Sequence, residues 1–179
     1  RVLAEDVVSE GDIPPHANSA MDGYALRAAD LAAEGPWRLR LGGEVAAGAW
    51  RQEPLQPGEA VRIMTGAPIP PGADAVVRFE ETSPQGNDVL LQRRPRAGSN
   101  VRAAGEDVRA GQEVLSAGLT LRPQEIGMLA ALGRAEVAVV RQPRVAVLST
   151  GDEVAPLGAP LHRGQIRDSN SYSLCAQVL

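Results

Sequence analysis

Short apolar runs alternate with turn-forming residues through much of the first hundred positions. Four such runs stand between turns that contain Gly, Pro or Asn: 37–41, 60–64, 75–79 and 89–92. Short runs of this kind, bounded by turn residues, are typical of β-strands. The pattern therefore predicts a β-rich, barrel-like module over residues 37–98. A Gln-Gly-Asn-Asp sequence at 85–88 predicts a hairpin loop within it.

Helical patterns are few. Residues 26–33 predict a short helix that Gly35-Pro36 ends. The clearest helix runs over 123–132, where a proline suits the first turn and Gly133 follows the last. Its predicted apolar face consists of Ile126, Leu129, Ala130 and Leu132. A strand over 136–140 is predicted to follow.

The pattern changes after Gln142-Pro143. The continuous apolar run 144–148 leads into Ser-Thr-Gly-Asp-Glu, as a buried strand leads into a ligand loop at the start of an α/β domain. A helix over 172–179 is predicted beyond it. One strand and part of one helix cannot bury a parallel sheet, so we expect this domain to be truncated.

The predicted fold class is accordingly α+β. A β-rich region of short strands and few helices, with two subdomains, is expected over 1–142, and the start of a truncated α/β domain over 143–179.

Composition narrows the function classes. The chain has 44% apolar and 22% charged residues, as ordinary soluble globular proteins do. A net charge of −4 argues against a nucleic-acid partner. No apolar run is long enough to span a membrane, and no signal peptide is evident at the start. The one cysteine, Cys175, excludes an intrachain disulfide and fits a cytoplasmic location. The chain has no lysine, which excludes Schiff-base chemistry.

The octet NSAMDGYA at 18–25 ends in a strand-like pair, Tyr24-Ala25, but neither a helical nor a strand period explains the apolar Met21 beside an acid and a glycine. Two interpretations of Asp22 remain open. Its carboxylate could cap the turn through a nearby backbone N–H. It could instead be presented to a polar ligand or to Mg²⁺, which prefers oxygen ligands.

Two downstream motifs also allow two interpretations each. The sequence MTGAP at 64–68 is either a turn or an oxyanion site made by the Thr65 hydroxyl and exposed N–H groups around Gly66. The sequence GED at 105–107 is either a surface turn or the neighbour of an anion clamp formed by Arg102 and Arg109.

The last two motifs follow the predicted buried strand. Asp152 and Glu153 form a carboxylate pair at its end. The triplet 168–170 (Asp-Ser-Asn) is either the N-cap of the next helix or a phosphate site at the helix N-terminus.

The ordered series NSAMDGYA, RIMTGAP with GADAVV, GED, VAVLSTGDE and RDSN resembles the MoeA family of molybdopterin molybdenumtransferases, which includes the E domain of gephyrin-like proteins. The resemblance implies insertion of molybdate into adenylylated molybdopterin, with release of AMP and dependence on Mg²⁺ or a similar divalent cation. It also implies a homodimer in which the N-terminal region of one subunit faces the α/β domain of the other. The molybdopterin adenylyltransferase is a further implied partner.

Carried onto this sequence, the resemblance marks Asp22, Thr65, Asp107 and Glu153 as catalytic candidates. Asp22 and Glu153 would hold the metal, Thr65 would donate a hydrogen bond to substrate, and Asp107 would contribute electrostatically. The implied substrate-binding residues are Ser19, Met21, Gly66, Asp152, Asp168, Ser169 and Asn170.

The family's later Gly-Gly loop and Pro-Gly-Asn-Pro segment are absent, so we expect the chain to be inactive alone. Two alternatives from other classes are a gephyrin-like scaffold and a non-catalytic dimerisation module.

Overall fold

The structure is a computed structural model that describes residues 1–178. The elements in chain order are β1 (Val7–Val8), β2 (Asn18–Ser19), β3 (Gly23–Leu26), η1 (Ala28–Asp30), β4 (Trp37–Val45), β5 (Glu59–Ile63), β6 (Ala75–Arg78), η2 (Phe79–Glu81), β7 (Thr82–Gln85), β8 (Asp88–Leu91), β9 (Val101–Arg102), β10 (Glu113–Leu115), α1 (Pro123–Ala131), β11 (Val154–Ala155), β12 (Ile166–Arg167) and α2 (Asn170–Val178). They fall into two compact units. The first is Val2–Ala138, and the second is the segment from Val139 onward with Arg1.

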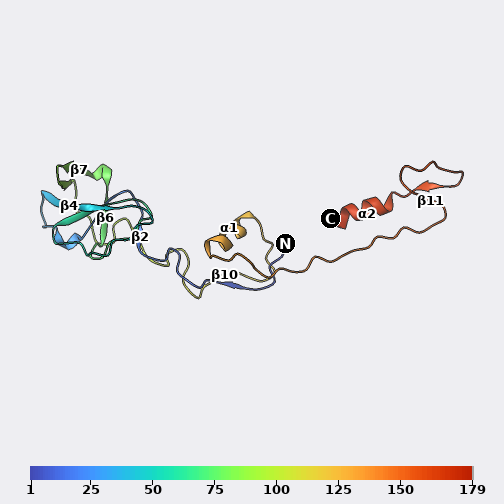
Figure 1. The fold of residues 1–179 in the computed structure, drawn as a ribbon, viewed down its shortest axis with the longest axis horizontal. Coiled ribbons are helices and arrows are strands. Elements are labelled where there is room, and N and C mark those ends of the chain that lie inside the picture. Colours follow the sequence, from blue (N-terminus) through green and yellow to red (C-terminus); the bar gives the residue numbers. More distant parts are fainter. Residues whose placement is uncertain (179) are drawn as a thin grey trace. The chain divides into compact units, whose positions relative to one another are not determined.

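The first unit is built on a six-stranded sheet in the order β6-β3-β5-β4-β8-β7 (Figure 1). Neighbouring strands are antiparallel except for β4 and β5, which run parallel. The predicted β-rich fold with few helices is confirmed. The predicted hairpin at 85–88 is confirmed as well, because β7 and β8 pair antiparallel around Gly86, whose φ is +59°.

Strand β3 is central to this sheet and is buried on both faces. Tyr24 and Leu26 pack into the cluster that contains Leu39 and Val89, whereas Ala25 packs on the other face with Val61. Its neighbours also approach closely, since a Cβ at Gly23 would collide with the carbonyl oxygen of Val77. The glycine after Asp22 in the octet therefore has a packing explanation.

The predicted helix over 26–33 is wrong in extent. Strand β3 continues to Leu26, and the helical turn is the three-residue 3₁₀ segment η1. Asp74 Oδ1 accepts the Ala28 N–H at 2.7 Å, and Asp30 pairs with Arg27 at 2.7 Å. These side-chain bonds hold a tight turn where the residue pattern suggested a longer helix.

Helix α1 confirms the helix predicted near 123–132. The Arg122 N–H donates to the Glu125 carboxylate at 2.8 Å, and Gly133 ends the helix with a φ of +72°. Leu129 packs with Leu3 and Val7 in a separate small core. The predicted apolar face is wrong at Ile126 and Ala130, which are both exposed, because the buried face instead carries Leu129 and the paired Glu125.

The strand predicted over 136–140 is not formed as such. Val137 packs against the small core that contains Leu3 and Leu129. The Ala138 N–H donates to Glu5, and the Ala138 carbonyl accepts the Ala4 N–H.

The second unit departs most from expectation. The buried strand predicted over 144–148 is wrong: no strand forms there, and Leu148 is 87% exposed. A parallel strand is stabilised by neighbours on its edges and helices on its faces. The described part of this unit supplies the short parallel pair β11–β12 and the helix α2. The helix predicted over 172–179 is confirmed up to Val178, and Leu179 lies outside the described residues. No helix within residues 1–178 is long and apolar enough to cross a membrane.

Candidate functional site

Two sequence motifs meet strand β9 in the first unit. Strand β2, from the octet, pairs antiparallel with β9, so that Asn18 lies opposite Arg102. The octet also contacts the MTGAP turn: the Ser19 N–H donates to the Ala67 carbonyl at 3.0 Å, and Ser19 accepts the Gly66 N–H at 2.8 Å. Backbone pairing thus brings residues 18–22, 64–68 and 100–102 to one place.

The chemical centre of this place is a pair formed by Asp22 and Thr65. The Thr65 N–H and the Thr65 hydroxyl both donate to Asp22 Oδ1, each at 2.6 Å. Both residues are exposed. Asp22 Oδ2 makes no hydrogen bond to any residue in the described part of the chain. The carboxylate is therefore fixed through one oxygen and presents the other.

The same contacts set the charge of Asp22. The hydrogen bond from the Thr65 hydroxyl, followed by that from the Thr65 N–H, lowers the pKa of Asp22 below its ordinary value of 3.8, and the Arg62 guanidinium adds to the effect. Asp22 is thus anionic at neutral pH. Arg62 begins the RIMTGAP motif on β5 but is not among the predicted site residues.

The cap and the presented carboxylate are both realised in Asp22, since one oxygen caps the Thr65 turn and the other is open. The oxyanion interpretation of the MTGAP turn is wrong. The Thr65 N–H is taken by Asp22, the Gly66 N–H by Ser19 and the Ala67 N–H by Met64. The Thr65 hydroxyl directs its proton at Asp22, so the lone pairs that remain on it can only accept a hydrogen bond or bind a cation.

Ser19 and Met21 differ in accessibility. Ser19 is 1% exposed, and its hydroxyl donates to the Met21 carbonyl at 2.5 Å while accepting the Met21 N–H at 3.3 Å. Ser19 thereby holds the shape of the loop. Met21 is 41% exposed beside Asp22. A direct substrate contact from either residue stays a prediction, and Met21 is the accessible one.

Asp107 is tied to the same region through Arg102. Both carboxylate oxygens of Asp107 accept from Arg102 Nη2, at 2.6 and 2.7 Å, and Glu106 accepts from Arg102 Nε at 3.1 Å. The pairing raises the pKa of Arg102, chiefly through the hydrogen bond to Asp107. Arg102 is therefore neutralised by two carboxylates, and the anion clamp considered for it is wrong.

The second unit holds the other predicted residues. Asp152 and Glu153 lie in an exposed turn, and a Cβ at Gly151 would come within 2.5 Å of the Glu153 carboxylate. Asp168 caps helix α2 by accepting the Ser171 N–H at 3.0 Å, while the Ser169 carbonyl accepts the Ser173 N–H at 3.1 Å. Ser171, with a smaller contribution from Ser149, lowers the pKa of Asp168. Asn170 begins the helix, so the N-cap interpretation of this triplet describes the structure.

A metal cage is not assembled within either unit. Residues 1–178 contain no group of three or more His, Cys, Asp or Glu side chains placed to hold an ion. Within the Asp22–Thr65 pair, the oxygen atoms that could still bind a cation are Asp22 Oδ2 and the Thr65 hydroxyl oxygen. Hard oxygen donors in this number suit Mg²⁺, which proteins often hold with one or two carboxylates while the substrate completes the coordination.

Comparison with known proteins gives a consistent set of relatives. The family model described as "MoeA N-terminal region (domain I and II)" matches residues 1–133. A protein of Mycobacterium tuberculosis (strain ATCC 25618 / H37Rv) named molybdopterin molybdenumtransferase 2 is 44% identical over 99% of this chain and 44% of its own length. A molybdopterin molybdenumtransferase of Nostoc sp. (strain PCC 7120 / SAG 25.82 / UTEX 2576) is 45% identical over 99% of this chain and 42% of its own length.

A solved structure agrees with these sequence relatives. The molybdopterin biosynthesis moeA protein from Pyrococcus horikoshii OT3 superposes with a TM-score of 0.89 and 39% identity, over 99% of this chain and 48% of that one. The chain therefore spans less than half the length of the relatives it matches.

Proposed function

The chain belongs to the MoeA family, and we propose that it forms the N-terminal part of a molybdopterin molybdenumtransferase. The proposed reaction inserts molybdate into adenylylated molybdopterin and releases AMP, in the biosynthesis of molybdenum cofactor. Support comes from the family match over residues 1–133 and from relatives of that name at 44% and 45% identity.

The observation that carries the proposal is the Asp22–Thr65 pair. Two donors from one residue hold Asp22 Oδ1 at 2.6 Å, which leaves an oriented anionic oxygen on an exposed loop. Cleavage of a phosphoanhydride depends on positioning and charge neutralisation more than on a protein nucleophile. A fixed carboxylate is suited to both tasks, since it can orient a substrate N–H or O–H group or a cation.

Mg²⁺ fits the donor set of this pair. Asp22 Oδ2 and the Thr65 hydroxyl oxygen would hold it from this unit, and the substrate's phosphate oxygens would complete the shell. We propose Glu153 as a second carboxylate ligand, supported by the resemblance of the STGDE motif. Bound there, the cation would neutralise charge that develops on the phosphate group. Asp107 acts through Arg102, which lies opposite Asn18 on the paired strands β2 and β9.

The assembly and location are also proposals. We propose a homodimer in which the Asp22–Thr65 pair of one subunit faces an α/β domain of the other. We also propose that the molybdopterin adenylyltransferase is a partner that supplies the substrate. A cytoplasmic location is supported by the single cysteine in 179 residues.

The test is Asp22→Asn in the complete gene product that contains this chain, with AMP release as the readout. Loss of the charge should lower the rate of AMP release by about 100-fold or more, as removal of one transition-state electrostatic contact does. Asp88→Asn is the matched control, because Asp88 pairs with Arg38 in the β4–β8 ladder. A folded Asp22→Asn variant with the wild-type rate would remove Asp22 from the mechanism.

A further inference from the structure

A pocket of about 260 Å³ adjoins Gly66, the residue after Thr65. Its walls come from residues 15, 16, 18, 48–50, 66 and 68, all in the first unit. Pockets that enclose a whole drug-sized ligand measure roughly 300–1,000 Å³. This one has room for a ring system and not for an entire nucleotide.

Two aromatic side chains form one wall of the pocket. The rings of His16 and Trp50 lie with their centroids 5.4 Å apart and their planes at 59°. Trp50 is 56% exposed, although the chain contains few aromatic residues and buries Tyr24 in its core. A single exposed apolar residue needs no explanation, but an indole beside a second ring at a concave surface is typical of a site for a flat ligand.

Two glycines in turns line the pocket. Gly48 and Gly66 each have a φ of +80° in a turn closed by a backbone bond, Ala49 N–H to Ala46 in one and Ala67 N–H to Met64 in the other. Both positions match the third residue of a type II turn. A Cβ at either glycine would meet no protein atom within 4 Å. A side chain there would project into open space beside the pocket.

Asn18 is a polar residue of the pocket lining. Its Oδ1 is buried and accepts no hydrogen bond, and it is the sole buried side-chain nitrogen or oxygen without a partner among residues 1–178. Buried polar atoms in native proteins nearly always have a partner. An N–H or amino group on the edge of a ring, with a small rotation of the amide, would supply the donor.

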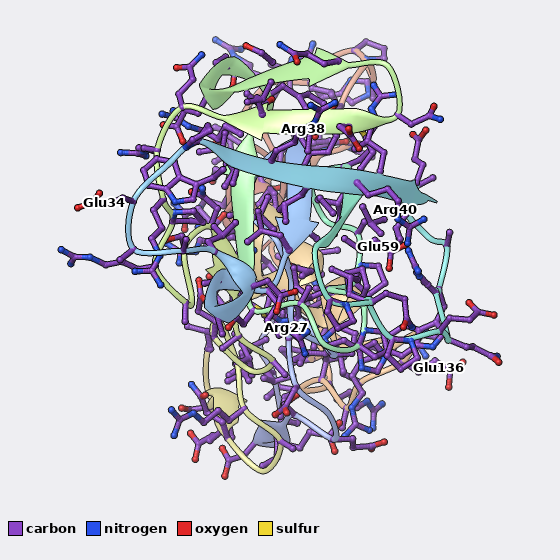
Figure 2. The ribbon with its side chains drawn as sticks, turned by 90° about the vertical axis from the view of Figure 1, so that its left-hand side faces the viewer. Arg27, Glu34, Arg38, Arg40, Glu59 and Glu136 are labelled. Carbon is purple, nitrogen blue, oxygen red and sulfur yellow. The ribbon has the colours of Figure 1, made fainter. Side chains whose placement is uncertain are left out.

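The wall that carries Trp50 is anchored from behind by the next residue. Arg51 donates to the Gly42 carbonyl at 3.1 Å and to the carboxylate of Glu59 at 3.3 Å. Glu59 is 4% exposed and also accepts the Gln56 N–H at 2.7 Å. Figure 2 shows Glu59 next to Arg40 near the end of β4, where the two groups lie 4.0 Å apart. Arg51 and Glu59 are thus positioning residues for the aromatic wall.

We propose that this pocket, which we call the ring pocket, binds the planar nitrogen heterocycle of the substrate. The ring would stack on Trp50 and His16 and give an N–H to Asn18. The lining that the structure describes contains no arginine and no carboxylate, so a phosphate group is not its occupant. Pterin and adenine share the required chemistry, and their assignment as substrate rests on the proposed function.

The experiment is calorimetric titration of the 179-residue chain with three probes: pterin, AMP and ribose 5-phosphate. At least one ring-bearing probe should bind, and ribose 5-phosphate should not. Trp50→Ala should weaken binding of that ring at least 10-fold and Asn18→Ala several-fold. Trp37→Phe, a change to the other tryptophan, should leave it unchanged. Circular dichroism checks that each variant is folded.

The two ring-bearing probes, pterin and AMP, distinguish the two candidate rings of the substrate. Binding of pterin alone assigns the pocket to the pterin, and binding of AMP alone assigns it to the adenine. Wild-type affinity in folded Trp50→Ala, or no binding of either ring, would overturn the ring pocket. Neither result bears on the proposed function, which is tested separately by AMP release from the complete gene product and its Asp22→Asn variant. Conversely, Trp50-dependent ring binding together with no AMP release by the complete wild-type gene product would retain the pocket and remove the proposed function.

Discussion

The two units of the chain hold their acidic motifs in different ways. In the first unit, Asp22 lies between β2 and the fully buried strand β3, and its partner Thr65 is 43 residues away. In the second, Asp152 and Glu153 lie in an exposed turn and Asp168 is held by Ser171, three residues along. In the first unit a long-range contact orients the Asp22 carboxylate beside the sheet, whereas in the second a local hydrogen bond makes Asp168 the cap of a helix. The first unit therefore contains a preorganised part of a site within itself.

The largest test of this contrast is a matched pair of Leu→Ala substitutions. Leu26 is fully buried in β3, whereas Leu148 is 87% exposed. Leu26→Ala should lower the free energy of unfolding by about 2–5 kcal/mol because it leaves a cavity. Leu148→Ala should change it by no more than about 0.5 kcal/mol. Urea denaturation measures both, and equal effects would mean that the second unit has a core that includes Leu148.

A second substitution tests the close approach of strands behind Asp22. Gly23→Ala places a Cβ against the Val77 carbonyl, which should cost roughly 1–3 kcal/mol of unfolding free energy. Gly11→Ala is the control, because a Cβ there meets nothing within 4 Å. If the two variants unfold at the same urea concentration, β3 and β6 are farther apart than described.

The sequence could predict those parts of the fold that are encoded locally. Apolar runs that stand between turn residues, such as 75–79, form strands, and Pro123 and Gly133 mark the two ends of helix α1. Strand β3 is predicted only as the strand-like pair 24–25, because burial on both faces removes the alternation that identifies a longer strand. The strand predicted over 144–148 does not form, because an apolar run becomes a buried strand only where neighbouring strands and helices cover it.

The candidate site was predictable to the same extent. The motifs identified Asp22 and Thr65 as residues, but their contact depends on register across β3 and β5, which no local pattern encodes. The hydrogen bonds that occupy the Thr65 and Gly66 N–H groups, to Asp22 and Ser19, likewise join residues far apart in the sequence. For the same reason, residues 16, 18 and 50 could not be grouped into one pocket from their spacing.

A third prediction concerns acid. Hydrogen bonds from the Arg122 side chain hold the pKa of Glu125 at about 2, below its usual 4.5. A lowered carboxylate pKa stabilises the folded state above the unfolded-state pKa, and the contribution is lost as pH falls from about 4.5 toward about 2. The protection factors of the α1 amides, which compare the observed exchange rate with the intrinsic rate at the same pH, should therefore fall over this range. Glu125→Gln should abolish that dependence and Glu34→Gln should keep it. An unchanged profile in Glu125→Gln would contradict the cap.

The smallest expected effect is a shift in one pKa. Thr65→Val removes the hydroxyl that contributes most to lowering the pKa of Asp22, so this pKa should rise toward 3.8. Carboxyl NMR titration measures it, with Thr120→Val as the control on an exposed threonine. No rise in Thr65→Val would show that the hydroxyl does not bond to Asp22 in solution.

The central claim is that Asp22 and Thr65 act as one unit, and a double-mutant cycle on the complete gene product tests it most directly. AMP release is measured for Asp22→Asn, Thr65→Val and the double variant, each verified as folded. If the hydroxyl acts by orienting the carboxylate, Thr65→Val should lower kcat/KM in the wild type but add almost nothing to Asp22→Asn. Losses that multiply in the double variant would contradict the claim, because they would mean that the two residues contribute independently.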